Sequence, residues 1–334
     1  MQDRKMVAYY LPEKTLDNET LAILYPNWNA EKIYKKTGIK TRRIADKNEY
    51  TSDMAYIAAK NLLGEYNINK TDIDFIILVT QTPDYLLPTT ACIIQNKLGI
   101  SLSSGAFDLN LGCSGYVYGL AVAKTLIMSN VAKQVLLLTA DVYTKFINDM
   151  DKSVRTLFGD GASATLINEY IANDIGNFEF GTDGSGWDKF VIPYSGARTA
   201  NNNQDLNEYS DDNGNVRSNR NIYMDGAEIF NFTIEKIPTA VRNVLNKNNL
   251  TMTDIDLFVF HQANVFMLDH LKKIMKIEDE RFYISMENIG NTVSSSIPIA
   301  LKTADSEGIL HKGKKVMLVG FGVGLSWGAT IVDW

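Results

Sequence analysis

Two patterns of hydrophobic and polar positions alternate along this 334-residue chain. Short continuous apolar runs are typical of strands that are buried on both faces of a layered sheet. Between these runs lie segments whose apolar side chains recur every three or four residues, which predicts amphipathic helices. Strands that alternate with helices indicate an α/β fold. The predicted helices cover residues 90–98, 114–129, 227–246 and 266–275.

The alternation occurs twice, because two distant parts of the chain resemble each other. TDIDFIILVTQTPDY begins at Thr71, and TDIDLFVFHQANVFM begins 182 residues later at Thr253. KQVLLLTADV and KKVMLVGFGV are likewise similar, at an offset of 181 residues. Nearly equal offsets indicate two copies of one unit. We therefore predict two similar halves, residues 1–172 and 173–334, with a site at the seam between them.

Residues 195–221 interrupt this pattern in the second half. They include almost no large apolar side chains and are rich in Asn, Asp, Ser and Gly. Such a stretch cannot bury enough apolar surface to form part of a core. We predict a polar insertion that forms a surface loop or lid.

Composition is that of an ordinary globular protein, with 45% hydrophobic and 22% charged residues. No apolar run reaches the roughly 18 residues of a membrane span, and MQDRKMVAYYLPE lacks the apolar core of a signal peptide. The net charge of −6 argues against broad nucleic-acid binding. We therefore expect a cytoplasmic protein that binds neither membrane nor nucleic acid. The two cysteines show no zinc-binding spacing, so we expect reduced thiols and no metal.

Cys113 lies in GAFDLNLGCSGYVYGLAVAKTLI, where an apolar strand gives way to a long helix. Unpaired N–H groups and the positive end of the helix dipole favour a thiolate there, and a thiolate is a nucleophile. Gly112 and Gly115 permit a sharp corner and close approach of a substrate. Free cysteines are also common as small core residues, and the position alone leaves both interpretations open. Cys92, inside a helical pattern, is assigned to packing.

Two residues of the second half could join Cys113. His261 directly follows the apolar run LFVF, so it lies at the edge of the sheet where α/β proteins build their sites. A hydrogen-bonded core histidine is an equally good interpretation of this residue alone. Asn291, in ENIGNTVSSSIPIALKTA, precedes a helix, and its amide taken alone is better explained as a helix cap.

Glycine-rich segments occur at FGDGASATLI and at the terminal GFGVGLSWGATIVDW. A dinucleotide fingerprint needs a helix, a further strand and an acidic residue after its glycines. Only ten residues follow Gly324, so that interpretation fails. Close backbone approach to a substrate, or an N–H group that binds an oxyanion, fits the segment better.

These motifs occur together in the order and spacing of one enzyme family. LGCSGYVYGL, HQAN, GNT and GFGVGLSWGA, with TGIKTRRIA and LLPTTACIIQNKLGI nearer the start, resemble β-ketoacyl-acyl carrier protein synthase III, a condensing enzyme of the thiolase superfamily. The resemblance runs almost end to end. It implies a thiolase-like fold, with two duplicated α/β halves in a layered αβαβα architecture. It also assigns catalytic roles to Cys113 in the first half and to His261 and Asn291 in the second.

The resemblance implies a decarboxylative condensation in two stages. Cys113 attacks a primer, acetyl-CoA or another short acyl-CoA, and the backbone N–H groups of Cys113 and Val323 form the oxyanion hole. Malonyl-acyl carrier protein then loses carbon dioxide, and His261 and Asn291 stabilise the enolate that attacks the acyl-enzyme. The reaction needs no metal or other cofactor. The family also implies a homodimer and a role in fatty-acid biosynthesis.

Further positions follow from the same resemblance. The implied substrate-binding residues are Leu87, Arg155, Asn264 and Gly322. The chain departs from the family at three positions. Leu87 stands where many relatives have Phe, and Lys32-Ile33 stands where the family often has a Trp that stacks on the CoA adenine. Phe266 stands where relatives have an Arg that helps the carrier protein to dock. Lys272 and Lys273 form a nearby cationic pair, for which we predict docking of the acidic carrier protein.

Three alternative functions differ in chemistry. One is an acyltransferase or condensing enzyme of specialised metabolism in the same superfamily, and another is a cysteine thioester hydrolase. The hydrolase needs a base to activate water, and the motifs contain no carboxylate for that role. The third, a catalytically silent interaction protein, disagrees with an intact Cys, His and Asn set. Primer length, the identity of the carrier protein and the pathway are not predicted.

Overall fold

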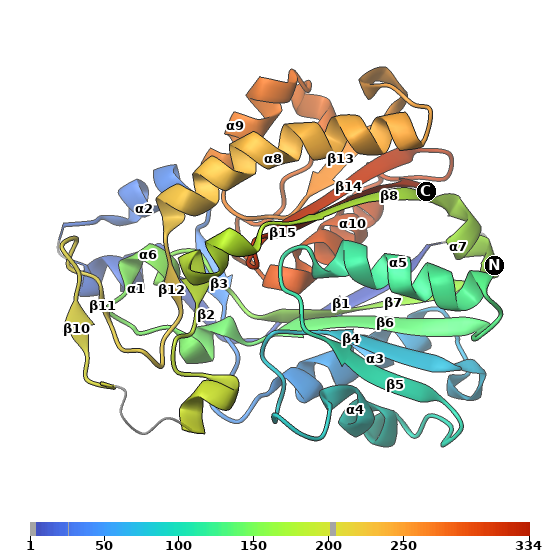
Figure 1. Cartoon of the computed structure of the whole chain (residues 1–334), viewed down its shortest axis with the longest axis horizontal. Helices are drawn as coiled ribbons and strands as arrows, with labels where there is room; N and C mark the ends of the chain where they lie inside the picture. Colours follow the sequence, from blue (N-terminus) through green and yellow to red (C-terminus); the bar gives the residue numbers. More distant parts are fainter. Residues whose placement is uncertain (1–4, 26, 201–204) are drawn as a thin grey trace.

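The computed structural model describes residues 5–25, 27–200 and 205–334, and its elements form layers (Figure 1). Two sheets lie face to face, with a pair of helices between them and further helices on each outer face. The inner pair is α5 (Gly115–Met128) and α10 (Ser296–Ser306), which contact strands of both sheets. The predicted αβαβα architecture is therefore confirmed.

The first half of the chain builds a five-stranded sheet in the order β1-β7-β6-β4-β5. Strand β4 runs parallel to β5 and β6, while β7 is antiparallel to β6 and β1. Helices α3 (Thr51–Glu65) and α4 (Thr90–Leu98) cover its outer face (Figure 1). The strands are β1 (Met6–Tyr10), β4 (Phe75–Val79), β5 (Gly105–Leu109), β6 (Gln134–Asp141) and β7 (Gly161–Asn168).

The second half builds a four-stranded sheet in the order β13-β14-β15-β8, covered on its outer face by α8 and α9 (Figure 1). Strand β13 runs parallel to β14, and β15 is antiparallel to β14 and β8. The bounds are β8 (Ile175–Thr182), α8 (Gly226–Lys247), β13 (Leu257–Phe260), α9 (Val265–Met275), β14 (Lys315–Gly322) and β15 (Ser326–Asp333).

The repeat in the sequence is a repeat in strand register. Phe75 on β4 pairs with Val135 on β6, and Leu257 on β13 pairs with Val316 on β14, both in parallel. These are the positions that the offsets of 182 and 181 residues align. The duplicated halves are thus confirmed, whereas the boundary at 172/173 stays a prediction inside α7 (Glu169–Asp174), which leads from the first sheet to the second.

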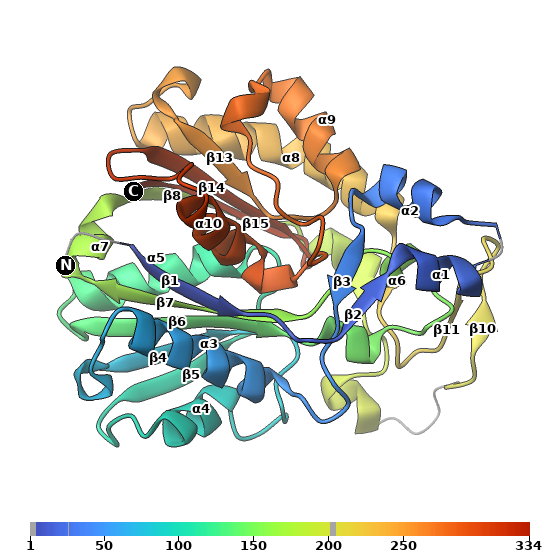
Figure 2. The same ribbon diagram turned by 180° about the vertical axis from the view of Figure 1, so that it is seen from behind.

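Smaller elements gather at one end of the layers (Figure 2). The predicted insertion 195–221 belongs to this region and is mostly exposed, and its residues 201–204 lie outside the described residues. Its hairpin is held by the buried Arg217, which forms ion pairs with Asp151 at 2.6 Å and Asp211 at 3.0 Å. The elements at this end are β2 (Thr15–Asp17), α1 (Asn18–Leu24), α2 (Ala30–Thr37), β3 (Thr41–Arg43), α6 (Lys152–Arg155), β9 (Phe190–Val191), β10 (Tyr209–Ser210), β11 (Val216–Arg217) and β12 (Tyr223–Met224).

Apolar side chains of both halves form one continuous core across the inner helices. Val79 and Leu137 of the first sheet belong to the same buried cluster as Val259 and Leu318 of the second. The two halves therefore hold their facing loops in a fixed relation. Among the described residues, no helix combines the length and the apolar character that crossing a bilayer requires.

Candidate active site

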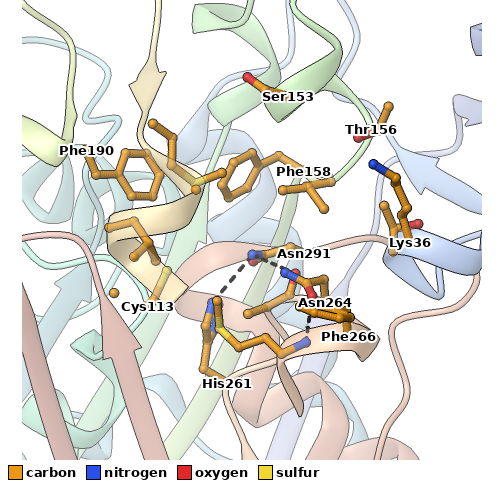
Figure 3. Close-up of a pocket in the computed structure, with 18 of the residues that line it drawn as sticks. Lys36, Cys113, Ser153, Thr156, Phe158, Phe190, His261, Asn264, Phe266 and Asn291 are labelled. Atoms are coloured by element: carbon orange, nitrogen blue, oxygen red, sulfur yellow. Dashed lines mark hydrogen bonds between the residues drawn. The ribbon is translucent and has the colours of Figure 1, made fainter. Parts of the chain in front are cut away.

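A cavity of about 460 Å³ lies at the seam between the two halves. Cys113, His261 and Asn291 line it, and in Figure 3 their side chains point toward one shared space. Cys113 comes from the corner between β5 and α5, His261 directly follows β13, and Asn291 precedes the turn that leads into α10. The structure thus brings together three residues that the sequence separates by up to 178 positions.

Cys113 is held where backbone of the second half closes over it. Its residue surface is 4% exposed. A Cβ atom added to Gly322 would lie 3.0 Å from Cβ and 3.1 Å from Sγ of Cys113, and Gly322 has a φ of +152°. Both facts favour glycine at this position. Gly322 lines the cavity and leaves the space beside the sulfur free, and its substrate-binding role stays a prediction.

The predicted thiolate at Cys113 needs correction. Burial raises the pKa of the Cys113 thiol to about 12, and the negative charge of Asp141 acts in the same direction. Hydrogen bonds from the backbone N–H groups of Cys113 and Val323 lower the pKa but do not offset burial. In the free enzyme the sulfur is consequently protonated at neutral pH.

The same two N–H groups approach the sulfur from different halves of the molecule. Cys113 N–H belongs to the corner before α5, and Val323 N–H follows the end of β14. Donors this close to a nucleophilic sulfur also lie near the oxygen of a carbonyl that the sulfur attacks. The geometry supports the predicted oxyanion hole.

His261 is fixed on three sides. Its backbone N–H donates to the carbonyl of Val319 at 2.8 Å, its Nδ1 lies 2.7 Å from Oγ of Ser296, and its ring meets the Phe321 ring edge-on with centroids 5.7 Å apart. Burial lowers the pKa of His261 to about 3. The imidazole is therefore neutral at physiological pH, and its Nε2 faces the cavity side occupied by Asn291.

Asn291 is buried, and its amide has a defined orientation. Its Oδ1 accepts the backbone N–H of Val293 at 2.9 Å, which leaves Nδ2 3.5 Å from Nε2 of His261 and 3.4 Å from the carbonyl of Ala263. Helix α10 is preceded by Ser295 as its N-cap, without a side-chain cap. The interpretation of Asn291 as the cap of that helix is therefore wrong.

The other predicted substrate residues lie at different distances from this cavity. Asn264 lines it, but its Oδ1 also caps α9 by accepting the N–H of Met267 at 2.9 Å. Arg155 forms an ion pair with Asp149 at 3.2 Å. Leu87 is 82% exposed. Neither Arg155 nor Leu87 is among the described residues that line the cavity, so their roles stay predictions.

The predicted docking pair lies on α9, whose first turn contributes Phe266 and Met267 to the cavity lining. Lys272 forms ion pairs with Asp269 at 3.1 Å and Asp279 at 2.7 Å, while Lys273 is exposed. Phe266, at the start of the same helix, lines the cavity and is 62% exposed, with its ring 5.4 Å from that of Phe230. An apolar side chain thus stands at the mouth where the family resemblance suggested an arginine.

Sequence reasoning missed Asp141, at the end of β6. It is fully buried, accepts hydrogen bonds from the N–H of Gln81 at 2.9 Å and of Ser294 at 3.3 Å, and burial raises its pKa to about 7. An aspartate directly after an apolar run was the signal that could have pointed to it. Among the described residues, no group of His, Cys, Asp and Glu side chains could hold a metal ion.

Comparison with known proteins agrees with the family resemblance. Residues 107–184 match the family model 3-oxoacyl-[acyl-carrier-protein] synthase III, and residues 245–334 match its C-terminal counterpart. The chain is 38% identical to a β-ketoacyl-[acyl-carrier-protein] synthase III of Clostridioides difficile, over 98% of this chain and 97% of the relative.

Solved structures with the same name have the same fold. A crystal structure of 3-oxoacyl-(acyl-carrier-protein) synthase III is 48% identical, covers 98% of both chains and superposes with a TM-score of 0.96. The corresponding synthase of Thermus thermophilus is 34% identical, with 98% of both chains covered and a TM-score of 0.85.

Proposed function

The chain belongs to the β-ketoacyl-[acyl-carrier-protein] synthase III family and is an acyltransferase, and we propose that Cys113, His261 and Asn291 carry out its reaction. That reaction is the decarboxylative condensation of an acyl-CoA primer with malonyl-acyl carrier protein. The observation that supports these roles is the single cavity in which a nucleophile of one half faces two polar side chains of the other.

In the first stage the sulfur of Cys113 attacks the carbonyl carbon of the acyl-CoA thioester. The N–H groups of Cys113 and Val323 donate to the tetrahedral oxyanion. The bond from carbon to the CoA sulfur then breaks, and the proton that Cys113 loses ends on the departing CoA thiol. The stage neither gains nor loses a proton overall, because one thiol replaces another. The attacking form is the thiolate, which the two N–H donors favour over the thiol.

In the second stage the malonyl thioester loses carbon dioxide and becomes an enolate. N–H groups of His261 and Asn291 donate to its oxygen, and the α-carbon attacks the acyl carbon on Cys113. A carbon–carbon bond forms, and the bond between that carbon and sulfur breaks. Cys113 leaves as a thiolate, which takes up a proton from water. Neutral His261 suits this role, since decarboxylation supplies the carbanion without proton abstraction.

The rest of the cavity fits the two substrates. Its wall near Cys113 includes Phe158, Phe190 and Met224, which offer an apolar environment for the acyl chain of the primer. Lys36 and Lys152 also line the cavity, and their cations favour the phosphates of CoA and of a phosphopantetheine arm. Trp28 also lines the cavity, with Lys36 Nζ 4.8 Å from its ring centre, and is our candidate for the missing adenine contact.

Thioester hydrolysis has weaker support. Water needs a base for attack on an acyl-cysteine, and the described residues that line the cavity include no carboxylate. No observation favours the specialised acyltransferase over the family reaction. No metal or other cofactor enters the proposed steps.

Two further expectations remain proposals. We propose a homodimer, because Tyr85, Leu86 and Leu87 expose 62, 77 and 82% of their surfaces on one loop, and adjacent exposed apolar residues mark interaction sites. Native mass spectrometry that finds only monomer at micromolar concentration would contradict it. A cytoplasmic location also stays a prediction.

The test of the function follows the label of radioactive acetyl-CoA in the presence of malonyl-acyl carrier protein. Condensation places the label in β-ketoacyl-carrier protein, hydrolysis releases free acetate, and an inactive protein does neither. We expect the first result for the wild type and for Cys92→Ala, whose exposed thiol lies outside the cavity, and no labelled product for Cys113→Ala. Free acetate as the main product would overturn the proposal.

A further inference from the structure

Three consecutive serines follow Asn291, and all three are buried: Ser294 and Ser295 precede helix α10, and Ser296 is its first residue. Each hydroxyl has a different partner. Ser294 donates to the carboxylate of Asp141, and Ser295 lies 2.8 Å from Oγ1 of Thr139. The first two serines thus tie this loop to strand β6 of the other half, and the third contacts His261.

The hydrogen bonds of Ser296 determine which nitrogen of His261 carries a proton. Its Oγ accepts the backbone N–H of Gln262 at 3.3 Å and lies 2.7 Å from Nδ1 of His261. A serine hydroxyl has one hydrogen and two lone pairs. If Nδ1 carried the proton, the hydroxyl would accept two bonds and leave its own hydrogen without a partner. The arrangement is complete when Ser296 donates to Nδ1.

The neutral imidazole then carries its proton on Nε2, on the side of Asn291. Nδ2 of Asn291 is 3.5 Å away, and its orientation is fixed because Oδ1 accepts the N–H of Val293. Val293 adopts a φ of +54°, which is rare and strained for a β-branched residue. One hydrogen of Asn291 Nδ2 faces the carbonyl of Ala263 at 3.4 Å. In the Nε2–H tautomer the other Nδ2 hydrogen and the Nε2–H of His261 lie side by side, with the two nitrogens 3.5 Å apart, and one oxygen placed beside both nitrogens accepts from both.

We propose that Ser296 is a positioning residue that selects the Nε2–H tautomer of His261, so that histidine and Asn291 donate together to the thioester oxygen of the malonyl substrate. The proposal rests on the proposed function. It deepens that function by explaining how a histidine that is neutral at physiological pH is kept as a donor rather than an acceptor. Without the hydroxyl, the Nδ1–H tautomer becomes accessible and turns a lone pair toward the substrate oxygen.

The direct test is the ¹⁵N NMR spectrum of enzyme labelled with ¹⁵N-histidine, recorded at neutral pH. The chain has only three histidines to assign. We expect Nε2 of His261 to carry the proton in the wild type. A wild-type spectrum with the proton on Nδ1 overturns the proposal without any variant.

The kinetic test separates the two half-reactions. Ser296→Ala should slow malonyl decarboxylation on the order of 10- to 100-fold, in line with lost orienting partners elsewhere, and leave acylation by acetyl-CoA within about twofold because no Cys113 contact changes. Ser295→Ala is the matched control, since it removes a buried hydroxyl of the same run without touching His261, and its tautomer should match the wild type.

Two results would reject the role of Ser296 while sparing the proposed function. In one, the wild type catalyses condensation, and the Ser296→Ala variant has the same His261 tautomer and the same decarboxylation rate as the wild type. The other is equal loss of decarboxylation in Ser295→Ala, which would indicate that only the fold of the loop matters. Failure of the wild type to condense at all would instead reject the proposed function.

Discussion

Burial and the helix terminus shift the pKa of Cys113 in opposite directions. A helix amino terminus stabilises a nearby negative charge by about 0.3–1 kcal/mol, less than the 1.36 kcal/mol that corresponds to one pKa unit. Burial is the larger effect and raises the pKa to about 12. The helix start is visible in the sequence. The depth of burial is not, because Gly322 closes over the sulfur from the other half.

The pH dependence of alkylation reports this balance. In Cys92→Ala, where Cys113 is the only thiol, the thiolate fraction below the pKa rises with pH. Inactivation by iodoacetamide should therefore accelerate about tenfold per pH unit between pH 7 and 9. A rate that levels off below pH 8 would show a thiolate in the free enzyme and contradict the effect of burial.

Gly322 is the residue whose side chain the site cannot accept. In Gly322→Ala the new methyl group would lie about as close to Sγ of Cys113 as the 3.1 Å found for an added Cβ. We expect acylation by acetyl-CoA to slow on the order of 10- to 100-fold, since small displacements of reacting atoms have effects of that size. Burst-phase kinetics measure this acylation rate.

A matched glycine substitution controls for general effects. Gly64, near the end of α3, has nothing within 4 Å of an added Cβ. Gly64→Ala should leave acylation unchanged and stabilise the protein by about 0.5–1 kcal/mol, because alanine favours a helix. Equal acylation rates for the two alanine variants would mean that Gly322 does not shape the site.

At the scale of elements, four helices were predicted with their bounds, whereas helix α3 and the loops between the elements were not. Each predicted helix agrees with the structure within one residue at both ends, because amphipathic spacing is a local property. The loop 291–296 gave no such signal. Its conformation depends on Asp141 and Thr139, whose strand is more than 150 residues away in the chain.

Asp141 makes the stability of this arrangement depend on pH. Burial raises its pKa from 3.8 to about 7, so between these pH values the folded state holds a proton that the unfolded state has lost. Stability then falls as pH rises through this window, by up to about 1.4 kcal/mol per pH unit. The Asp141→Asn variant has no carboxyl at this position, so it lacks this contribution to the pH dependence of stability.

Urea unfolding of the wild type and Asp141→Asn at pH 5 and pH 7 measures the difference. We expect the wild type to lose stability relative to the variant as the pH rises. Burial also raises the pKa of Asp160 to about 6. Because Asp160 is present in both proteins, its contribution to stability cancels in the difference between them. A difference between the two proteins that does not change with pH would show that Asp141 titrates as it does in the unfolded chain.

At the scale of the whole molecule, the repeat was the most informative feature of the sequence. Offsets of 181 and 182 residues predicted two halves with a site between them, and the strand register confirms the halves. The family resemblance pointed to Cys113, His261 and Asn291. Sequence reasoning missed Ser296 because its partner His261 lies 35 positions away within the same half, and it missed Asp141 because its partner Ser294 belongs to the other half.

The predicted docking of the carrier protein at Lys272 and Lys273 involves the surface of the whole molecule. Lys273 is exposed on α9, and Lys272 beside it already has two carboxylate partners. Replacing both with Gln should raise the KM for malonyl-acyl carrier protein several-fold at low salt and leave kcat unchanged, since rim charges act mainly on encounter. Lys133→Gln, at an exposed position just before β6, is the control. An unchanged KM would reject this patch.

The central claim is a division of labour between the halves, and one paired measurement tests it most directly. Intact-protein mass after acetyl-CoA treatment reports acylation, and release of labelled carbon dioxide from malonyl-carrier protein reports decarboxylation. We predict that Cys113→Ala loses the acetyl adduct but still releases carbon dioxide, and that a His261→Ala, Asn291→Ala double variant keeps the adduct but loses carbon dioxide release. An acetyl adduct that persists in Cys113→Ala, or undiminished carbon dioxide release in the double variant, would contradict the account.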